Sequence, residues 1–122
     1  MENKANELSE RFLDFAASIF MQLKSIDTNQ MNHHICMQLF RSSTSVGANY
    51  EEARGAESKQ DFAHKMKIVL KEARESQYWL KLIIRTGIDN SSEINNLLEE
   101  SRQISDIIAK SIKTLNSNLN KK

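Results

Sequence analysis

The chain contains no proline in 122 residues, and hydrophobic residues recur at helical spacing along nearly all of it. Proline ends helices because it lacks a backbone N–H and its ring clashes with the preceding turn, so a chain without proline can run in long helices. Only three glycines interrupt the pattern, which argues against a β-rich fold with many tight turns. The sequence therefore predicts an all-α protein, with residues 1–122 forming a single domain around one core.

Clusters of polar residues divide this pattern into four amphipathic segments. Asp27 to Gln30, Ser58 to Asp61 and Asn90 to Glu93 resemble capping boxes at helix N-termini, and Gly87 suits a helix C-terminus. The predicted helices span residues of about 6–26, 29–54, 58–86 and 91–118, followed by a tail that we expect to fray from Asn116. Because the loops are short, the helices should form an up-down-up-down antiparallel four-helix bundle.

The segment from Arg41 to Ala53, RSSTSVGANYEEA, keeps helical spacing but fills it with small and polar residues. Two hydrophobic seams run along this helix, and Ser43 and Gly47 lie on the second. Glycine inside a helix costs about 1 kcal/mol relative to alanine. We therefore expect Ser43 and Gly47 to allow close helix packing, with a neighbouring backbone passing near Gly47.

Two glutamates on the third helix could be catalytic or could fix the helix register. Folding the second helix onto the third about Ala56 places Arg41 opposite Glu72, and folding about Ile88 places Glu75 near Arg102. Paired carboxylates can do acid–base work or hold a metal. Since each glutamate has a predicted arginine partner, structural pairing is the favoured interpretation.

Evidence for catalysis or metal binding is weak. The only approach to the Glu-x-x-His motif of di-metal bundles is Asp61-Phe-Ala-His64. His33 and His34 begin the second helix whereas His64 begins the third, so an antiparallel pair separates them. A small metalloenzyme is the least favoured hypothesis, and we expect no catalytic residue, metal or cofactor.

The net charge of +1 hides an uneven distribution. Residues 58–87 carry seven Lys and Arg against three acids, whereas residues 1–28 carry three against five. Six residues of the third helix recur at spacings of four and three and form a basic stripe: Lys67, Lys71, Arg74, Tyr78, Lys81 and Arg85. Such a stripe can follow a phosphate backbone, with Tyr78 stacking on a base. The alternative is an ordinary solvated helix face, in keeping with the near-neutral total charge.

The opposite flank of the third helix carries Ile68, Trp79 and Leu82, away from its main seam. This second apolar patch suggests an interface between subunits, although a wide core-facing stripe would also explain it. A ring of several copies would gather the basic stripes on one surface and raise avidity.

The remaining features favour a soluble cytoplasmic protein. The single cysteine, Cys36, cannot form an internal disulfide and lies on an apolar helical face, where it suits a core. The N-terminal residues lack the apolar run of a signal peptide, and no stretch approaches the roughly 18 apolar residues of a membrane span.

Together, RSSTSVGANYEEA and the later SKQDFAHKMKIVLKEARESQYWLKLI resemble the four-helix-bundle proteins encoded within intervening sequences of bacterial 23S ribosomal RNA genes. The resemblance implies a left-handed bundle that assembles into a homopentameric, barrel-like ring. A related branch, the accessory proteins of diversity-generating retroelements, binds nucleic acid and a reverse transcriptase through a basic surface. The residues that match the family's polar positions are Arg41, Asn49, Glu52, Glu72 and Glu75.

Two hypotheses of function follow from these observations. The first is a non-enzymatic, oligomeric scaffold that associates with RNA or DNA through the basic stripe. The second is an assembly module that binds a protein partner, for example a reverse transcriptase, without touching nucleic acid itself.

Overall fold

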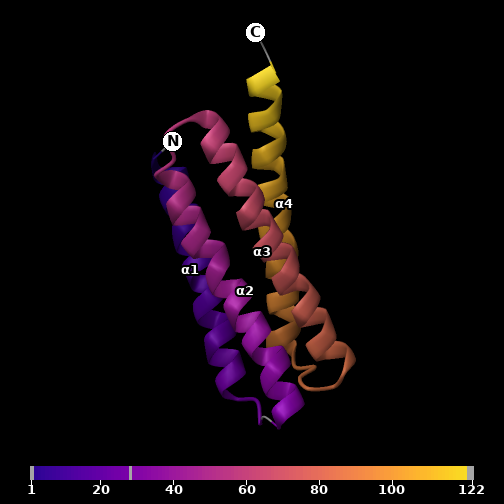
Figure 1. Cartoon of the computed structure of the whole chain (residues 1–122). Coiled ribbons are helices and arrows are strands. Elements are labelled where there is room, and N and C mark those ends of the chain that lie inside the picture. Colours follow the sequence, from indigo (N-terminus) through magenta and orange to yellow (C-terminus); the bar gives the residue numbers. More distant parts are fainter. Residues whose placement is uncertain (1, 28, 121–122) are drawn as a thin grey trace.

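The computed structural model describes residues 2–27 and 29–120, and these residues form four helices packed as a bundle (Figure 1). The helices are α1 (Glu2–Lys24), α2 (Gln30–Arg54), α3 (Lys59–Arg85) and α4 (Ser92–Asn120). The predicted all-α bundle is confirmed. Helix α1 begins earlier than expected, and α4 extends to Asn120, slightly past its expected end near residue 118. Fraying from Asn116 stays a prediction. The predicted domain also includes Met1, Thr28, Lys121 and Lys122, which lie outside the described residues.

Polar side chains cap the three helices that follow a loop. The side chain of Ser58 accepts a hydrogen bond from the backbone N–H of Asp61 at 3.0 Å, as the capping sequence predicts. Helix α2 is capped by Asn29 rather than Asp27. In α4 the hydroxyl of Ser91, not the side chain of Asn90, accepts a hydrogen bond from the backbone N–H of Ile94, at 3.2 Å. Gly87 follows the end of α3 with φ of +78°, a conformation that favours glycine.

Each helix packs on its two neighbours around a shared core, and within the described residues no Cα atom of α1 lies within 8 Å of one of α3. Figure 1 shows sequence neighbours running in opposite directions. Phe12 of α1 is fully buried, and its ring meets the ring of Tyr50 edge-on with 5.0 Å between centroids. Because α1 and α3 are diagonal in the bundle, they present their outer faces in opposite directions.

Small residues let α1 and α2 approach closely. A Cβ atom added to Gly47 would lie 3.5 Å from the Cβ and 3.7 Å from the carbonyl carbon of Phe12. The backbone of α1 therefore passes directly beside Gly47. Ser43 is fully buried nearby and donates its hydroxyl hydrogen to the carbonyl of Phe40 within its own helix. The buried hydroxyl of Ser76 on α3 donates to Ser42 on α2 at 2.9 Å.

The turn between α3 and α4 is tied to the end of α1. The side-chain amide of Gln22 donates to Asp89 at 2.7 Å, and the backbone N–H of Ser91 donates to the other carboxylate oxygen at 2.8 Å. Burial alone would raise the pKa of Asp89, but these hydrogen bonds outweigh it and lower the pKa below its ordinary value. The ionised carboxylate thus fixes where α4 begins relative to α3.

None of the described helices combines the length and the apolar character needed to cross a membrane.

Candidate nucleic-acid interface

The predicted basic stripe lies on the exposed side of α3. All six residues are exposed, and we call them the basic face of α3: Lys67, Lys71, Arg74, Tyr78, Lys81 and Arg85. None of its five cations forms an ion pair with another residue in the described part of the chain. Tyr78 is 58% exposed, so most of its ring is open to a stacking partner. The face thus combines unneutralised positive charge with an accessible aromatic ring.

The opposite side of α3 explains why these residues share one face. Met66, Val69 and Leu80 of α3 are buried in the core at complementary helical positions. Residues three and four apart lie on the same side of a helix, so burial of one set turns the other outward. From Lys67 to Arg85 the face runs about 27 Å at 1.5 Å per residue, which is long enough to follow several phosphates.

Arg102 of α4 extends this positive surface, contrary to its expected pairing with Glu75. It lines a hollow of about 380 Å³ between α3 and α4 together with Lys81 and Arg85. The turn from Thr86 to Ser91 brings the start of α4 beside the last turn of α3, and Glu75 lies on another flank of α3. Sequence reasoning placed Arg102 in a structural network and missed it as a member of a basic cluster. The sequence offered one indication of this role: Arg102 lies off the hydrophobic seam of α4, the helix that follows α3 in the chain.

Glu72 and Glu75 belong instead to a cluster between α2 and α3. Arg41 lies 3.3 Å from a carboxylate oxygen of Glu72, as the predicted register places it, and it also pairs with Glu75. The indole N–H of Trp79 donates to Glu75 at 3.3 Å. Arg41 therefore neutralises the two acids of α3 that lie on this flank, away from the basic face.

The other expected members of a polar network do not join this cluster. The side-chain amide of Asn49 donates to the carbonyl of Ser45 within α2, Glu52 is exposed, and Arg102 lies beside Lys81. A six-residue network is therefore wrong. The bond from Asn49 to Ser45 stays within α2 and links no two helices. Arg102 is a residue of α4 and lies beside the flank of α3 that is turned away from α2.

The expected subunit interface lies on the flank of α3 that faces α2. Ile68 is 37% exposed, whereas Trp79 and Leu82 are half-buried. Trp79 packs against the core, and its ring meets Tyr78 edge-on with 5.1 Å between centroids. These residues are thus partly core and partly surface, and their role between subunits stays a prediction.

A second exposed apolar surface lies on α1 and α2, where the sequence predicted none. Leu13 and Met21 are each 61% exposed, Phe20 is 47% exposed and Met37 is 46% exposed. The rings of Phe20 and Phe40 lie 6.0 Å apart between the two helices. The signal was present in the sequence, because Leu13 and Phe20 lie seven residues apart and off the main seam of their helix.

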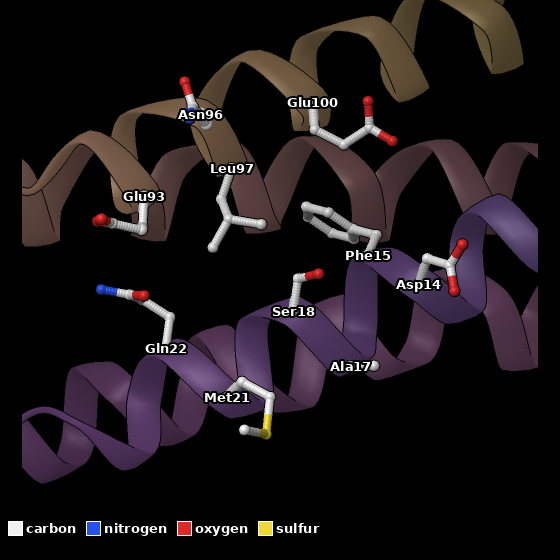
Figure 2. Close-up of a pocket in the computed structure, with 10 residues that line it drawn as sticks. All are labelled: Asp14, Phe15, Ala17, Ser18, Met21, Gln22, Glu93, Asn96, Leu97 and Glu100. Atoms are coloured by element: carbon white, nitrogen blue, oxygen red, sulfur yellow. The ribbon is translucent and has the colours of Figure 1, made fainter.

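An acidic groove separates α1 from α4, and its volume is about 630 Å³. Figure 2 shows Phe15 and Leu97 between the two helices, with the carboxylates of Asp14, Glu93 and Glu100 around them. Arg11 binds Glu100 at 2.7 Å, which neutralises one of these acids. Because carboxylates repel phosphate, this groove is unsuited to nucleic acid, and the basic face of α3 is the candidate interface.

The residues considered for a metal site lie apart. His33 and His34 are exposed at the start of α2, and His64 is exposed at the start of α3, at the other end of the bundle (Figure 1). Asp61 accepts a hydrogen bond from Lys65 at 2.9 Å, and this bond lowers the pKa of the carboxyl group. Across residues 2–27 and 29–120, no three His, Cys, Asp or Glu side chains cluster as metal ligands would. Asp61 thus stabilises the first turn of α3 through its bonds to Lys65 and to the backbone N–H of Glu57.

Comparison with known proteins places this bundle in a family. Residues 4–110 match the family model described as 23S rRNA-intervening sequence protein. A crystal structure of a protein of unknown function from the S23 ribosomal protein family of Bacteroides thetaiotaomicron superposes with a TM-score of 0.81. The two sequences are 36% identical over 90% of this chain and 98% of that one. A search of curated protein sequences finds no match. The chain belongs to the 23S rRNA-intervening sequence protein family.

Proposed function

We propose that this protein is a cytoplasmic, non-enzymatic scaffold that associates with RNA or DNA through the basic face of α3. One observation carries the proposal: five cations lie on one side of a single helix without an ion-pair partner among the described residues. Leaving so many like charges unneutralised side by side disfavours the free protein. A polyanionic ligand would relieve that repulsion.

The distribution of acids over the bundle supports the same assignment. The acids of α3 nearest this surface, Glu72 and Glu75, are paired with Arg41 on the α2 flank. The acidic groove lies between α1 and α4, and α1 is diagonal to α3. A nucleic acid would therefore be attracted to one side of the molecule and repelled from another, which orients it despite the small net charge of +1.

The wild-type protein is expected to bind single-stranded nucleic acid in a strongly salt-dependent manner. Each phosphate neutralised by a lysine or arginine releases condensed counterions, so log K should fall with log salt with a slope of roughly −0.7 per contact. Engagement of four or five cations predicts a slope of about −3 for a single strand. Fluorescence anisotropy of a labelled oligonucleotide between about 50 and 200 mM salt measures this slope. Absence of binding at the lowest salt would contradict the proposal.

The second candidate function is a protein-binding assembly module, favoured by the exposed apolar side chains. Ile68 on α3 and the half-buried Trp79 and Leu82 form one such surface. We propose that this flank joins copies of the chain into a ring, as the expected homopentamer requires. Self-assembly also serves the first function, since several basic faces on one particle raise avidity. A partner protein, such as a reverse transcriptase, would then bind the assembled ring.

A single charge on the α2–α3 flank is expected to prevent assembly. Ile68→Glu should convert the oligomer into a monomer, because a carboxylate would be buried without a partner in the interface. Leu13→Glu, on the exposed surface of α1, is the matched control and should leave the mass unchanged. Light scattering coupled to gel filtration measures both. A monomeric wild-type protein at micromolar concentration would contradict self-assembly. If Leu13→Glu were monomeric while Ile68→Glu stayed oligomeric, the interface would lie on α1 and α2 instead.

A further inference from the structure

We infer that the hollow between α3 and α4 is a nucleotide site, where one unit of a single-stranded nucleic acid places its phosphate on Lys81, Arg85 and Arg102. This inference rests on the proposed function and specifies the ligand at one end of the basic face. The hollow has a volume of about 380 Å³, within the range of roughly 300–1,000 Å³ usual for small-molecule sites. A single nucleotide is thus a suitable occupant.

Positive charge converges on this hollow from two helices. Lys81 and Arg85 come from the last turns of α3, and Arg102 comes from the third turn of α4. All three are exposed, and none forms an ion pair with another described residue. Two guanidinium groups can each bind phosphate through paired N–H donors. The cluster is therefore suited to a phosphate that enters between the helices.

The rest of the lining suits a sugar or a base better than a bare anion. Leu98 is 8% exposed and Ile84 is half-buried, and both are apolar members of the lining. The side-chain nitrogen of Asn95 already donates to Asn90 at 3.1 Å and to the carbonyl of Ser91 at 2.8 Å. Its remaining polar atom is the amide oxygen, an acceptor, which can receive a hydrogen bond from a base N–H group, such as that of thymine, or from a ribose hydroxyl in RNA. Inorganic phosphate would leave these groups unused.

Tyr78 adds a reason to expect a single strand. It precedes Lys81 by three residues, on the same exposed face of α3. Its ring rests edge-on against Trp79, with 5.1 Å between centroids, so it is partly held in place before any ligand binds. A neighbouring base could stack on this ring only if it is not already stacked within a duplex. The combination favours an unpaired strand over double-stranded DNA or RNA.

The surrounding charges limit the site to the hollow. Glu99 and Asp106 are exposed on α4, three residues before and four residues after Arg102, and they weaken the positive potential on either side of it. The turn that leads into α4 is held by the bond from Gln22 to Asp89, so the two helices that carry the three cations keep their relative position without a ligand. Binding then has to order the exposed side chains but not the backbone, which lowers its entropic cost.

The test compares two single-charge variants of α4 with the wild-type protein. Arg102→Gln removes the cation of the hollow, and Lys110→Gln removes an exposed cation about 12 Å further along the same helix at 1.5 Å per residue. The probe is a labelled oligothymidylate of about twelve nucleotides, titrated by anisotropy at about 50 mM salt. Arg102→Gln should weaken binding by roughly 5- to 20-fold and make the salt slope shallower by about 0.7, whereas Lys110→Gln should change affinity by less than about 2-fold.

An abasic strand of equal length separates a nucleotide site from a phosphate site. The wild-type protein should bind the abasic strand at least about fivefold more weakly, because the floor of the hollow and Tyr78 would lose their contacts. A duplex of the same length should also bind more weakly than the single strand. Equal loss in Arg102→Gln and Lys110→Gln, or equal binding of the abasic strand, would overturn the inference while leaving the proposed function intact. No binding of any strand by the wild-type protein would overturn both.

Discussion

Replacing Gly47 by leucine is expected to destabilise the protein by roughly 2 kcal/mol. Gly47 faces the backbone of α1, where an added Cβ would already lie 3.5–3.8 Å from the Cβ and carbonyl group of Phe12. Long side chains in helices avoid χ1 near +60°, which limits the directions in which leucine can turn away. The leucine side chain would therefore either push α1 away from α2 or adopt a strained rotamer. Urea denaturation, with the slope checked for constancy, measures the loss.

Gly47→Ala is the matched control, and its effect should have the opposite sign. The single Cβ meets α1 at ordinary van der Waals distances, so no atom has to move. Alanine should then contribute up to about 1 kcal/mol of stability, because glycine is the poorer helix former. If Gly47→Leu were as stable as Gly47→Ala, α1 would not be pressed against α2 at this position. Truncating Phe12 to alanine should not rescue Gly47→Leu, since alanine keeps the Cβ and carbonyl atoms concerned.

The close approach at Gly47 illustrates what the sequence could predict. The absence of proline, the helical period and the capping sequence at Ser58 were enough to define the helices, because each is a local property of the chain. Glycine inside a helix signalled a tertiary contact without naming the partner. The identity of Phe12 required the packing of α1 on α2, which depends on every contact of the bundle at once.

The two registers show where local reasoning stops. The turn from α2 to α3 is short, so folding about its middle places Arg41 opposite Glu72. The turn from Thr86 to Ser91 is longer and is shaped by the left-handed Gly87 and by the bond from Gln22 to Asp89. A shift of one residue in the register between two helices turns the facing side chain by about 100° around its helix axis. The longer turn shifts the register between α3 and α4, so the predicted pairing of Glu75 with Arg102 was wrong.

The same limit applies to the candidate site. The spacing of Lys67, Lys71 and their neighbours was sufficient to predict one basic face, since residues three and four apart share a side of the helix. Arg102 could not be assigned to it from sequence, because it lies on another helix and its position depends on the turn from α3 to α4. Similarly, two polar residues in succession, Asn90 and Ser91, could each have capped α4, and the tertiary contacts of the turn decided between them.

Reversing three charges on the basic face is expected to weaken nucleic-acid binding by at least about 100-fold at 50 mM salt. The variant combines Lys67→Glu, Lys71→Glu and Arg74→Glu, all at exposed positions of α3. Lost phosphate contacts and new repulsion both act against binding, and the salt slope should become shallower by about 2. Glutamate and lysine have similar helix propensities, so circular dichroism and thermal unfolding should stay close to those of the wild-type protein.

A second triple variant separates the basic face from net charge. This variant combines Lys4→Glu, Lys24→Glu and Lys110→Glu, which are also at exposed positions. Each substitution of lysine or arginine by glutamate lowers the net charge by two, so either triple variant changes it from +1 to −5. Two of these sites lie on α1, which is diagonal to α3 and has no Cα atom within 8 Å of it among the described residues. At 50 mM salt the Debye length is about 14 Å, so repulsion from these more distant sites is largely screened and binding should fall by less than about 10-fold. Equal losses in the two triples would mean that total charge governs binding, and the assignment of the interface to α3 would then be wrong.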